Sequence, residues 1–185
     1  MEIYIFFFMI FVILISNYAT ILIGINHYET KKSSDLFDIF HLLLPDLHRY
    51  SYIVDILGIF AVLSLVFVST NEITNEFIAK FILIMFIRAF TIISTILPKH
   101  EKCVTNVGNI QSLILGDCYD KIFSGHTSFM LLLTLLYYRE HIIHLPMLLG
   151  VNLLNIFLIL ATRSHYTVDV LLAIFVTTTI YSVKI

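Results

Sequence analysis

Charged residues are scarce in this sequence of 185 residues, and the few present nearly cancel. Asp, Glu, Lys and Arg make up 13% of the chain, against about 25% in a typical soluble domain, and 59% of the residues are hydrophobic. This composition excludes an ordinary soluble domain and indicates an integral membrane protein. The formal net charge of −2 provides no basic surface, so nucleic acid has no electrostatic reason to bind.

The sequence also lacks internal repeats, low-complexity tracts and the length for a second domain. At about 20 residues per crossing, a chain of this size supplies roughly six transmembrane helices with their loops. We therefore expect an all-α, multi-pass bundle of six transmembrane helices in one membrane domain, residues 1–185. The expected spans are 3–25, 53–70, 77–97, 125–138, 146–162 and 167–183.

The first apolar run lacks the features of a cleaved signal peptide. It has no basic start and no small-residue cleavage site, and it stays hydrophobic from Ile3 to Ile25. We expect a retained first helix, with removal as the alternative.

Two polar intervals follow. In the interval 26–52, Ser33, Ser34 and Asp35 are expected to cap a short apolar helix that lies in the membrane interface and ends at Pro45. The interval 71–76 is expected to form a short polar turn.

Arg88 stands near the middle of the third predicted span, where a charged residue costs roughly 2.5 to 3.5 kcal/mol on insertion scales. Thr91 and Thr95 share its helical face, and Pro98 is expected to close the helix. Arg88 therefore needs a partner. Two interpretations stay open: it bonds to carbonyls or to Asp55 within the bundle, or it shapes and charges an active-site pocket.

Two polar motifs stand at the starts of predicted spans. The first is Ser-Gly-His-Thr (124–127), and the second is His-Tyr-Thr-Val-Asp (165–169), which follows Arg163. With six crossings, both motifs open onto the same side of the membrane. Ionisable residues at such positions are candidates for function, and the shared side predicts one site.

The second motif favours nucleophilic chemistry. His165 and Asp169 are four residues apart, so at the start of a helix the carboxylate can fix the tautomer of the imidazole and raise its basicity. His165 is therefore the candidate nucleophile. The same spacing could also be half of a metal site.

The first motif favours binding of a phosphate. Ser124, Gly125 and His126 open a helix whose unpaired N–H groups would face an anion, and His126 is a candidate acid for a leaving alkoxide. Arg163 could clamp phosphate oxygens. The plainer alternative is that Ser124 is only a helix cap. The remaining histidines are expected to be polar side chains near lipid headgroups: His27, His41, His48, His100, His141 and His144.

Four segments in register resemble motifs of the sphingomyelin synthases and related ceramide phosphotransferases. Residues 118–127 resemble a Cys-Gly-Asp-x-x-x-Ser-Gly-His-Thr motif, and residues 165–170 resemble a His-Tyr-Thr-x-Asp-Val motif. Residues 88–98 are similar to an Arg-x-x-Thr-x-x-x-Thr-x-Leu-Pro stretch, and 44–46 to a Leu-Pro-Asp segment. The resemblance extends over about residues 44–180.

The resemblance implies a six-helix fold of the phosphatidic acid phosphatase type 2 superfamily with a catalytic triad of His126, His165 and Asp169. The family moves a phospho-headgroup (phosphocholine, phosphoethanolamine or phosphoinositol) from a glycerophospholipid to ceramide through a phospho-histidine, with release of diacylglycerol. Ser124, Gly125, Arg163 and Arg88 would contact the substrate phosphate. The implied partners are membrane lipids, with a homo-oligomer left open. No metal or cofactor is implied.

Two departures from the family pattern bear on function. Tyr119 replaces a glycine of the first motif. The superfamily's Lys-x6-Arg-Pro phosphatase motif is not matched, because Lys80 and Arg88 are one residue too far apart and Ala89 follows. This favours a transferase, with a lipid phosphatase or phospholipase C-type hydrolase as the alternative and a protein with a decayed site as a third.

Two arguments about sidedness disagree. The family places its site on the lumenal or exoplasmic side of endomembranes such as the Golgi, or of the plasma membrane. Of the 11 Lys and Arg, seven lie on the predicted motif side, three on the other and one within a span, which by the positive-inside rule favours the cytosol. We follow the family, since an anionic ligand explains basic residues around a site. On a lumenal side Cys103 and Cys118 could pair, or they could be free thiols.

Overall fold

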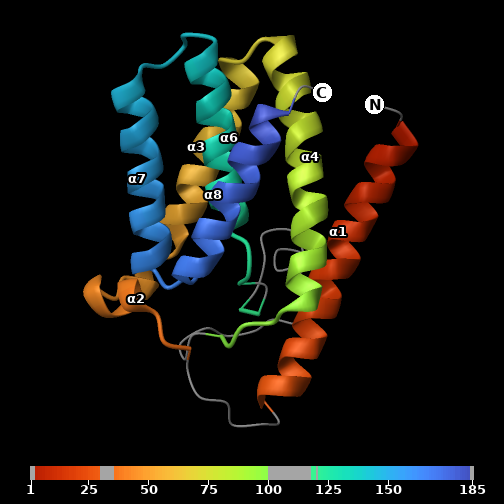
Figure 1. The fold of residues 1–185 in the computed structure, drawn as a ribbon, viewed down its shortest axis with the longest axis vertical. Helices are drawn as coiled ribbons and strands as arrows, with labels where there is room; N and C mark the ends of the chain where they lie inside the picture. The colour runs from red at the N-terminus through yellow and green to blue at the C-terminus, as the bar shows by residue number, and fades with distance from the viewer. Residues whose placement is uncertain (1–2, 30–35, 100–117, 120, 184–185) are drawn as a thin grey trace.

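The computed structural model describes residues 3–29, 36–99, 118–119 and 121–183. Within this part of the chain the fold is all-α, as predicted, and contains no strand. The described residues form six long helices in a bundle, and a short helix, α2 (Ile39–Leu43), lies beside it (Figure 1). The long helices are α1 (Ile3–Gly24), α3 (Tyr52–Phe67), α4 (Asn71–Ser94), α6 (Gly125–Arg139), α7 (Leu145–Ala161) and α8 (Thr167–Ser182).

The long helices run alternately up and down, so both polar motifs reach the same end of the bundle. In Figure 1, α6 and α8 begin at the lower end, where α1, α4 and α7 finish and α2 lies. We call this the motif end. The opposite end carries both chain termini and the turns that join α3 to α4 and α6 to α7 (Figure 1). The arrangement agrees with the shared side that the sequence predicts.

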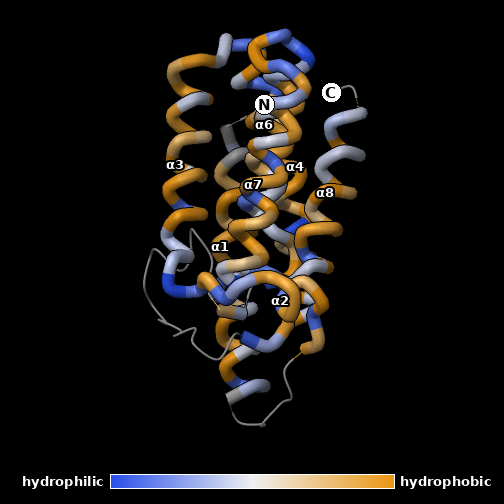
Figure 2. The backbone as a smooth tube through the Cα atoms, turned by 90° about the vertical axis from the view of Figure 1, so that its left-hand side faces the viewer, coloured by the Kyte–Doolittle hydropathy of each residue, from blue (hydrophilic) through white to orange (hydrophobic). Residues whose placement is uncertain are grey.

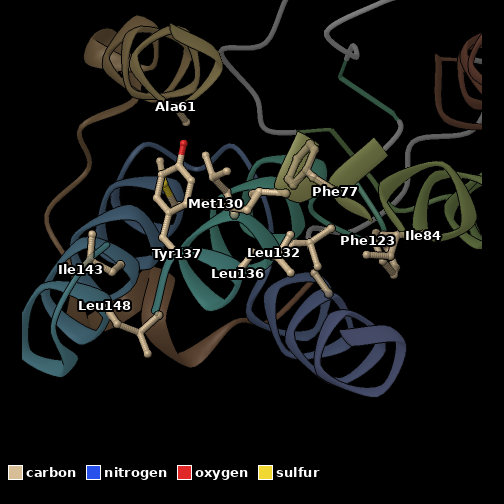
Figure 3. Close-up of a cluster of buried hydrophobic side chains, with 13 residues drawn as sticks. Ala61, Phe77, Ile84, Phe123, Met130, Leu132, Leu136, Tyr137, Ile143 and Leu148 are labelled. Carbon is tan, nitrogen blue, oxygen red and sulfur yellow. The ribbon is translucent and has the colours of Figure 1, made fainter. Parts of the chain in front are cut away.

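Helix α6 lies at the centre of the bundle and contacts α3, α4, α7 and α8. Its buried side chains pack against residues from all four neighbours in one apolar cluster, which Figure 3 shows in close-up. Tyr137 points its hydroxyl towards α3, where it is hydrogen-bonded to Ser69 (2.8 Å) and Ser64 (3.3 Å). The first motif is thus attached to the most centrally packed helix.

Helix α1 packs mainly against α4. One of its faces is buried and carries mainly small and polar residues, together with Ile21: Ser16, Asn17, Thr20 and Gly24. Small residues at a helix interface let two backbones approach closely in a membrane, where apolar packing alone gives little driving force. Large side chains on other faces of α1 are exposed, as expected for lipid contact.

Two boundary predictions need correction. The polar segment 71–76 is helical, because the Thr70 hydroxyl accepts the N–H of Ile73 and starts α4 there. The short helix between the first two spans is capped by Asp38, whose carboxylate accepts from the N–H groups of Phe40 and His41. The predicted caps at 33–35 lie outside the described residues.

Three of the described helical segments are long and apolar enough to cross a membrane: Phe7–Gly24, His48–Phe67 and Asn71–Ser94. Helices α7 and α8 are apolar but shorter. Figure 2 shows apolar residues along most of the helices, with polar residues gathered mainly near their ends. This pattern supports a membrane protein, whereas the number of six crossings stays a prediction.

Candidate active site

The first motif forms the start of α6. Ser124 is the N-cap: its Oγ accepts from the Thr127 N–H at 3.3 Å and from the Thr127 hydroxyl at 2.9 Å, and both residues are buried. Phe123, just before the cap, has a φ of 70°, a left-handed conformation that is rare for a bulky residue and concentrates at functional sites. The capping role expected of Ser124 is confirmed.

The second motif forms the start of α8. The N-cap is Tyr166, and the Asp169 Oδ2 accepts the Tyr166 N–H at 2.9 Å. Asp169 is fully buried, and its Oδ1 has no hydrogen-bond partner among the described residues. Arg163, which precedes the motif, also has a left-handed φ, of 59°. A residue with a left-handed backbone conformation therefore precedes each motif.

His165 takes its tautomer from the first motif's loop. Its Nδ1 is hydrogen-bonded to the carbonyl oxygen of Lys121, whereas the Asp169 Oδ2 lies 3.7 Å away. A carbonyl can only accept, so Nδ1 carries the proton and the lone pair of the neutral ring is on Nε2. We expected Asp169 to fix this tautomer. It is turned towards the Tyr166 N–H instead, and it supplies negative charge close to the ring.

His126 lies against α3. Its Nε2 is 3.3 Å from the Asp55 Oδ1, and its ring passes over Gly58, where a Cβ would be 3.5 Å from the ring carbon Cδ2. Both side chains are partly exposed. The sequence did not predict that Asp55 would be the partner of His126.

The loops before α6 and α8 are joined directly. The Lys121 Nζ donates to the Ser164 carbonyl at 2.6 Å, and the Ser124 N–H donates to the Asp169 carbonyl at 3.4 Å. Together with the bond from His165 to Lys121, these contacts hold the two motifs side by side. The structure thus brings together the two segments that carry His126, His165 and Asp169.

Arg163 donates hydrogen bonds to backbone carbonyls of two different segments of the chain. Its guanidinium donates to the Leu160 carbonyl at 3.2 Å and to the Leu44 carbonyl at 2.9 Å, and the side chain is buried. It thereby closes the end of α7, whose last carbonyls need donors, and fastens the segment after α2. The phosphate-clamping role stays a prediction.

Arg88 also supports the first motif. Its Nε donates to the Phe123 carbonyl at 3.2 Å, and its Nη1 donates to the Asn17 Oδ1 of α1 at 3.1 Å. The partners of Arg88 among the described residues thus include a backbone carbonyl, whereas Asp55 faces His126. Gly125 lies close by, since a Cβ there would be 3.8 Å from the Arg88 Nε. Arg88 therefore shapes the loop from within the bundle.

Histidines assigned to the headgroup region contact the second motif's loop. His41 Nε2 is 3.0 Å from the His165 carbonyl, and His48 Nδ1 is 3.2 Å from the Thr162 carbonyl. Burial lowers the pKa of the His41 imidazole below its usual 6.5, with Arg163 and Lys121 acting in the same direction. Sequence reasoning missed both contacts, since no spacing pattern marks a histidine that donates to a distant carbonyl.

Asp38 was missed as well. Besides capping α2, its carboxylate accepts from the Thr167 N–H at 2.6 Å and from the Thr167 hydroxyl at 2.8 Å. Burial by itself would raise the pKa of Asp38, but the bonds from Thr167 and His41 hold it below the usual 3.8. The only signal in the sequence was its place before an apolar run, which is typical of an N-cap.

Tyr119 packs against the end of α1. Its ring is fully buried and stacks on Tyr28 with centroids 5.9 Å apart, and the Lys99 Nζ lies 5.6 Å from its centroid. A Cβ on Gly24 would lie 2.4 Å from the Tyr119 Cγ, so only glycine permits this approach. Gly24 of α1 therefore leaves the space for Tyr119, which stands where the family motif has a glycine.

The adjacent Cys118 is buried and disulfide-bonded. The other cysteine of the chain, Cys103, lies outside the described residues. In the described part of the chain, no three His, Cys, Asp or Glu side chains are grouped so that they could hold a metal ion.

A comparison with known families bears on these helices. Residues 117–185 match the family model described as PAP2 superfamily C-terminal. The match covers α6, α7 and α8, and so both histidine motifs. It supports the superfamily part of the predicted resemblance and lipid chemistry of the phosphatase or phosphotransferase type. No curated protein matches the chain significantly. The narrower resemblance to sphingomyelin synthases stays a prediction.

Proposed function

We propose that the protein is a ceramide phosphotransferase of the sphingomyelin synthase type. It would move a phospho-headgroup from a glycerophospholipid to ceramide and release diacylglycerol. The observation that carries the proposal is the hydrogen bond from His165 Nδ1 to the Lys121 carbonyl, which puts the ring's lone pair on Nε2. A histidine with a defined tautomer, beside a buried carboxylate and at the start of a helix, is suited to attack phosphorus.

The two histidines divide the reaction into two steps. In the first, His165 Nε2 forms a bond to phosphorus, the bond from phosphorus to the diacylglycerol oxygen breaks, and His126 protonates that oxygen. In the second, His126 takes the proton of the ceramide hydroxyl, whose oxygen attacks phosphorus and displaces His165 Nε2. Asp55, 3.3 Å from His126, stabilises the imidazolium that exists before the first proton transfer and after the second. Asp169 does the same for the charge that develops on His165.

Phosphate contacts are proposed at the start of α6, where the N–H groups of Gly125 and His126 begin the helix. Arg163 and Arg88 add positive charge near the same loops, while their guanidinium groups hold backbone carbonyls. We propose that their main contribution to phosphate binding is electrostatic.

A lipid phosphatase or phospholipase C-type hydrolase remains the second candidate, because the matched superfamily's chemistry includes hydrolysis. In that reaction water replaces ceramide in the second step. The position of Lys80 favours the transferase. Its Nζ donates to the Tyr181 carbonyl at 2.7 Å and pairs with Glu76 at 2.9 Å, at the opposite end of the bundle from both motifs. It therefore does not act as the lysine of a phosphatase motif.

We further propose that the motif end faces the lumen or the cell exterior. A disulfide at Cys118 is supporting evidence, because disulfides persist in oxidising compartments. The basic residues that argued for the cytosol have another explanation, since Lys121 and Arg163 are used to hold backbone carbonyls.

The test is a lipid assay on the full chain made cell-free in liposomes. The liposomes contain phosphatidylcholine, phosphatidylethanolamine and phosphatidylinositol, with fluorescent ceramide as acceptor. A labelled phosphosphingolipid that is lost in the His165→Ala variant supports the transferase, and its headgroup identifies the donor. Diacylglycerol without labelled product supports the hydrolase. Turnover that survives in His165→Ala contradicts the assignment of the nucleophile.

A further inference from the structure

The carboxylate of Asp38 caps two helices at once. It accepts from the N–H groups of Phe40 (3.0 Å) and His41 (3.1 Å) at the start of α2, and from the N–H and hydroxyl of Thr167 at the start of α8. The first N–H groups of a helix have no partner within it. Tyr166 makes the N-cap of α8, and its own N–H is taken by Asp169, so the Thr167 N–H is left for Asp38.

His41 holds the same segment from a second point. Its Nε2 donates to the His165 carbonyl at 3.0 Å, and its ring stacks on Tyr166 with centroids 5.2 Å apart. Between them, Asp38 and His41 therefore contact three consecutive residues, 165–167, by backbone and side chain.

We infer that Asp38 and His41 are positioning residues, which hold His165 in the orientation needed for attack on phosphorus. The inference rests on the function proposed above. The His165 ring is fixed through Nδ1 by the Lys121 carbonyl, and its main chain is fixed by α2. Together, these two constraints help to define where Nε2 points. A displacement of about 1 Å at a reacting atom can reduce a rate about 100-fold.

The contacts are suited to this role because α2 contributes little to the core. None of its own residues is buried, and Leu42 and Leu43 are about 70% exposed. Loss of Asp38 should therefore release a peripheral helix without unfolding the bundle.

The experiment compares Asp38→Ala, Thr167→Val and the double variant in the full chain, reconstituted in liposomes. Thr70→Ala is the matched control, because it removes a side-chain cap at the opposite end. We expect Asp38→Ala to lower kcat at least about tenfold with little change in KM, and Thr70→Ala to stay within about twofold of the wild type. The double variant should be no slower than Asp38→Ala, since the hydroxyl bond that Thr167→Val removes is already lost in Asp38→Ala.

A second pair of variants tests the hydrogen bond from His41 to the His165 carbonyl. His41→Gln keeps an N–H donor that can reach the His165 carbonyl, whereas His41→Ala does not. We expect His41→Gln to retain more of kcat than His41→Ala. Equal losses in the two variants would count against a role for the hydrogen bond.

Hydrogen exchange supplies a readout that does not depend on activity. Asp38→Ala should speed deuterium uptake in peptides covering 165–170 and leave those covering 125–139 unchanged. Unchanged uptake at 165–170, or faster uptake with an unaltered kcat, overturns the inference. If the wild type turns over no lipid, the proposed function fails, and uptake at 165–170 still decides whether α2 holds this segment.

Discussion

The two ends of the bundle use their charged side chains differently. At the opposite end, Glu76 accepts two hydrogen bonds from Arg139, at 2.8 and 2.7 Å, and pairs with Lys80 at 2.9 Å. At the motif end, Lys121 and Arg163 donate to backbone carbonyls of the loops. The charges of Glu76, Arg139 and Lys80 thus fasten helices to each other, whereas Lys121 and Arg163 hold the loops that carry the histidines.

Substituting one arginine at each end should give the largest contrast. Arg163→Met leaves the carbonyls of Leu44 and Leu160 without their donor, which should displace the second motif and lower activity about 100-fold. Arg139 is 41% exposed, so Arg139→Met should cost less than about 1 kcal/mol of stability and leave activity nearly unchanged. Activity assays and thermal unfolding of both variants check this. Comparable losses of activity would remove the distinction between the ends.

A pair of glycine variants compares a closely packed position of α1 with an open position of α7. Gly24→Ala places a methyl group 2.4 Å from the Tyr119 Cγ, and such overpacking should destabilise the protein by about 2 kcal/mol. A Cβ added at Gly150 of α7 would have nothing within 4 Å, so Gly150→Ala should be neutral or stabilising, by up to about 1 kcal/mol. Thermal unfolding in detergent measures both. A drop for Gly150→Ala as large as that for Gly24→Ala contradicts the packing described for Tyr119.

Substitution of Asp55 should have a smaller effect, which is confined to kcat. Asp55→Asn keeps the size of the side chain and removes the negative charge beside His126. We expect kcat to fall about tenfold, part of the roughly 10²- to 10⁴-fold that general acid–base catalysis contributes. Stability should change little, because the Asp55 side chain is 46% exposed. An unchanged kcat would mean that His126 does not depend on this carboxylate.

The smallest expected effect is on pH dependence. The pKa of His41 is lower in the folded protein than its usual 6.5, so the unfolded chain binds the proton more readily. The stability contributed by His41 is therefore complete above about pH 6.5 and is lost as the pH falls below it. Asp38, with a pKa below 3.8, has the same sign but acts only in strong acid.

Hydrogen exchange at 38–44, measured between about pH 7.5 and 5.5 on either side of the usual histidine pKa, tests this sign. Uptake, corrected for the intrinsic rate, should rise on acidification in the wild type. The rise should be absent in His41→Gln, which does not titrate. A rise in both proteins would assign the effect to another group.

The sequence was sufficient to predict most helices and the location of the motifs. Hydrophobic runs predicted spans that begin at residues 125 and 146, and α6 and α7 begin at Gly125 and Leu145. The start of α4 at Asn71 was missed because its first turns are polar. We took the polar residues 71–76 to form a turn, but the end of a helix that extends beyond the apolar core need not be hydrophobic.

The partners within the site were less predictable, for a physical reason. The acceptor for His165 is a backbone carbonyl, which every residue possesses and no sequence pattern marks. The pairing of His126 with Asp55 depends on how α3 and α6 pack. Residue types and spacing could therefore indicate candidate reactive side chains, but not what holds them in place.

The hydrogen bond from His165 to Lys121 also has a consequence for biosynthesis. The histidine immediately precedes α8, and its acceptor belongs to the loop before α6. Until these two helices associate, the imidazole exchanges between tautomers and has no fixed direction. On the proposed mechanism, a chain that is still entering the bilayer thus carries its nucleophile in a latent form, and reactivity towards the surrounding lipids would arise only with the completed tertiary structure.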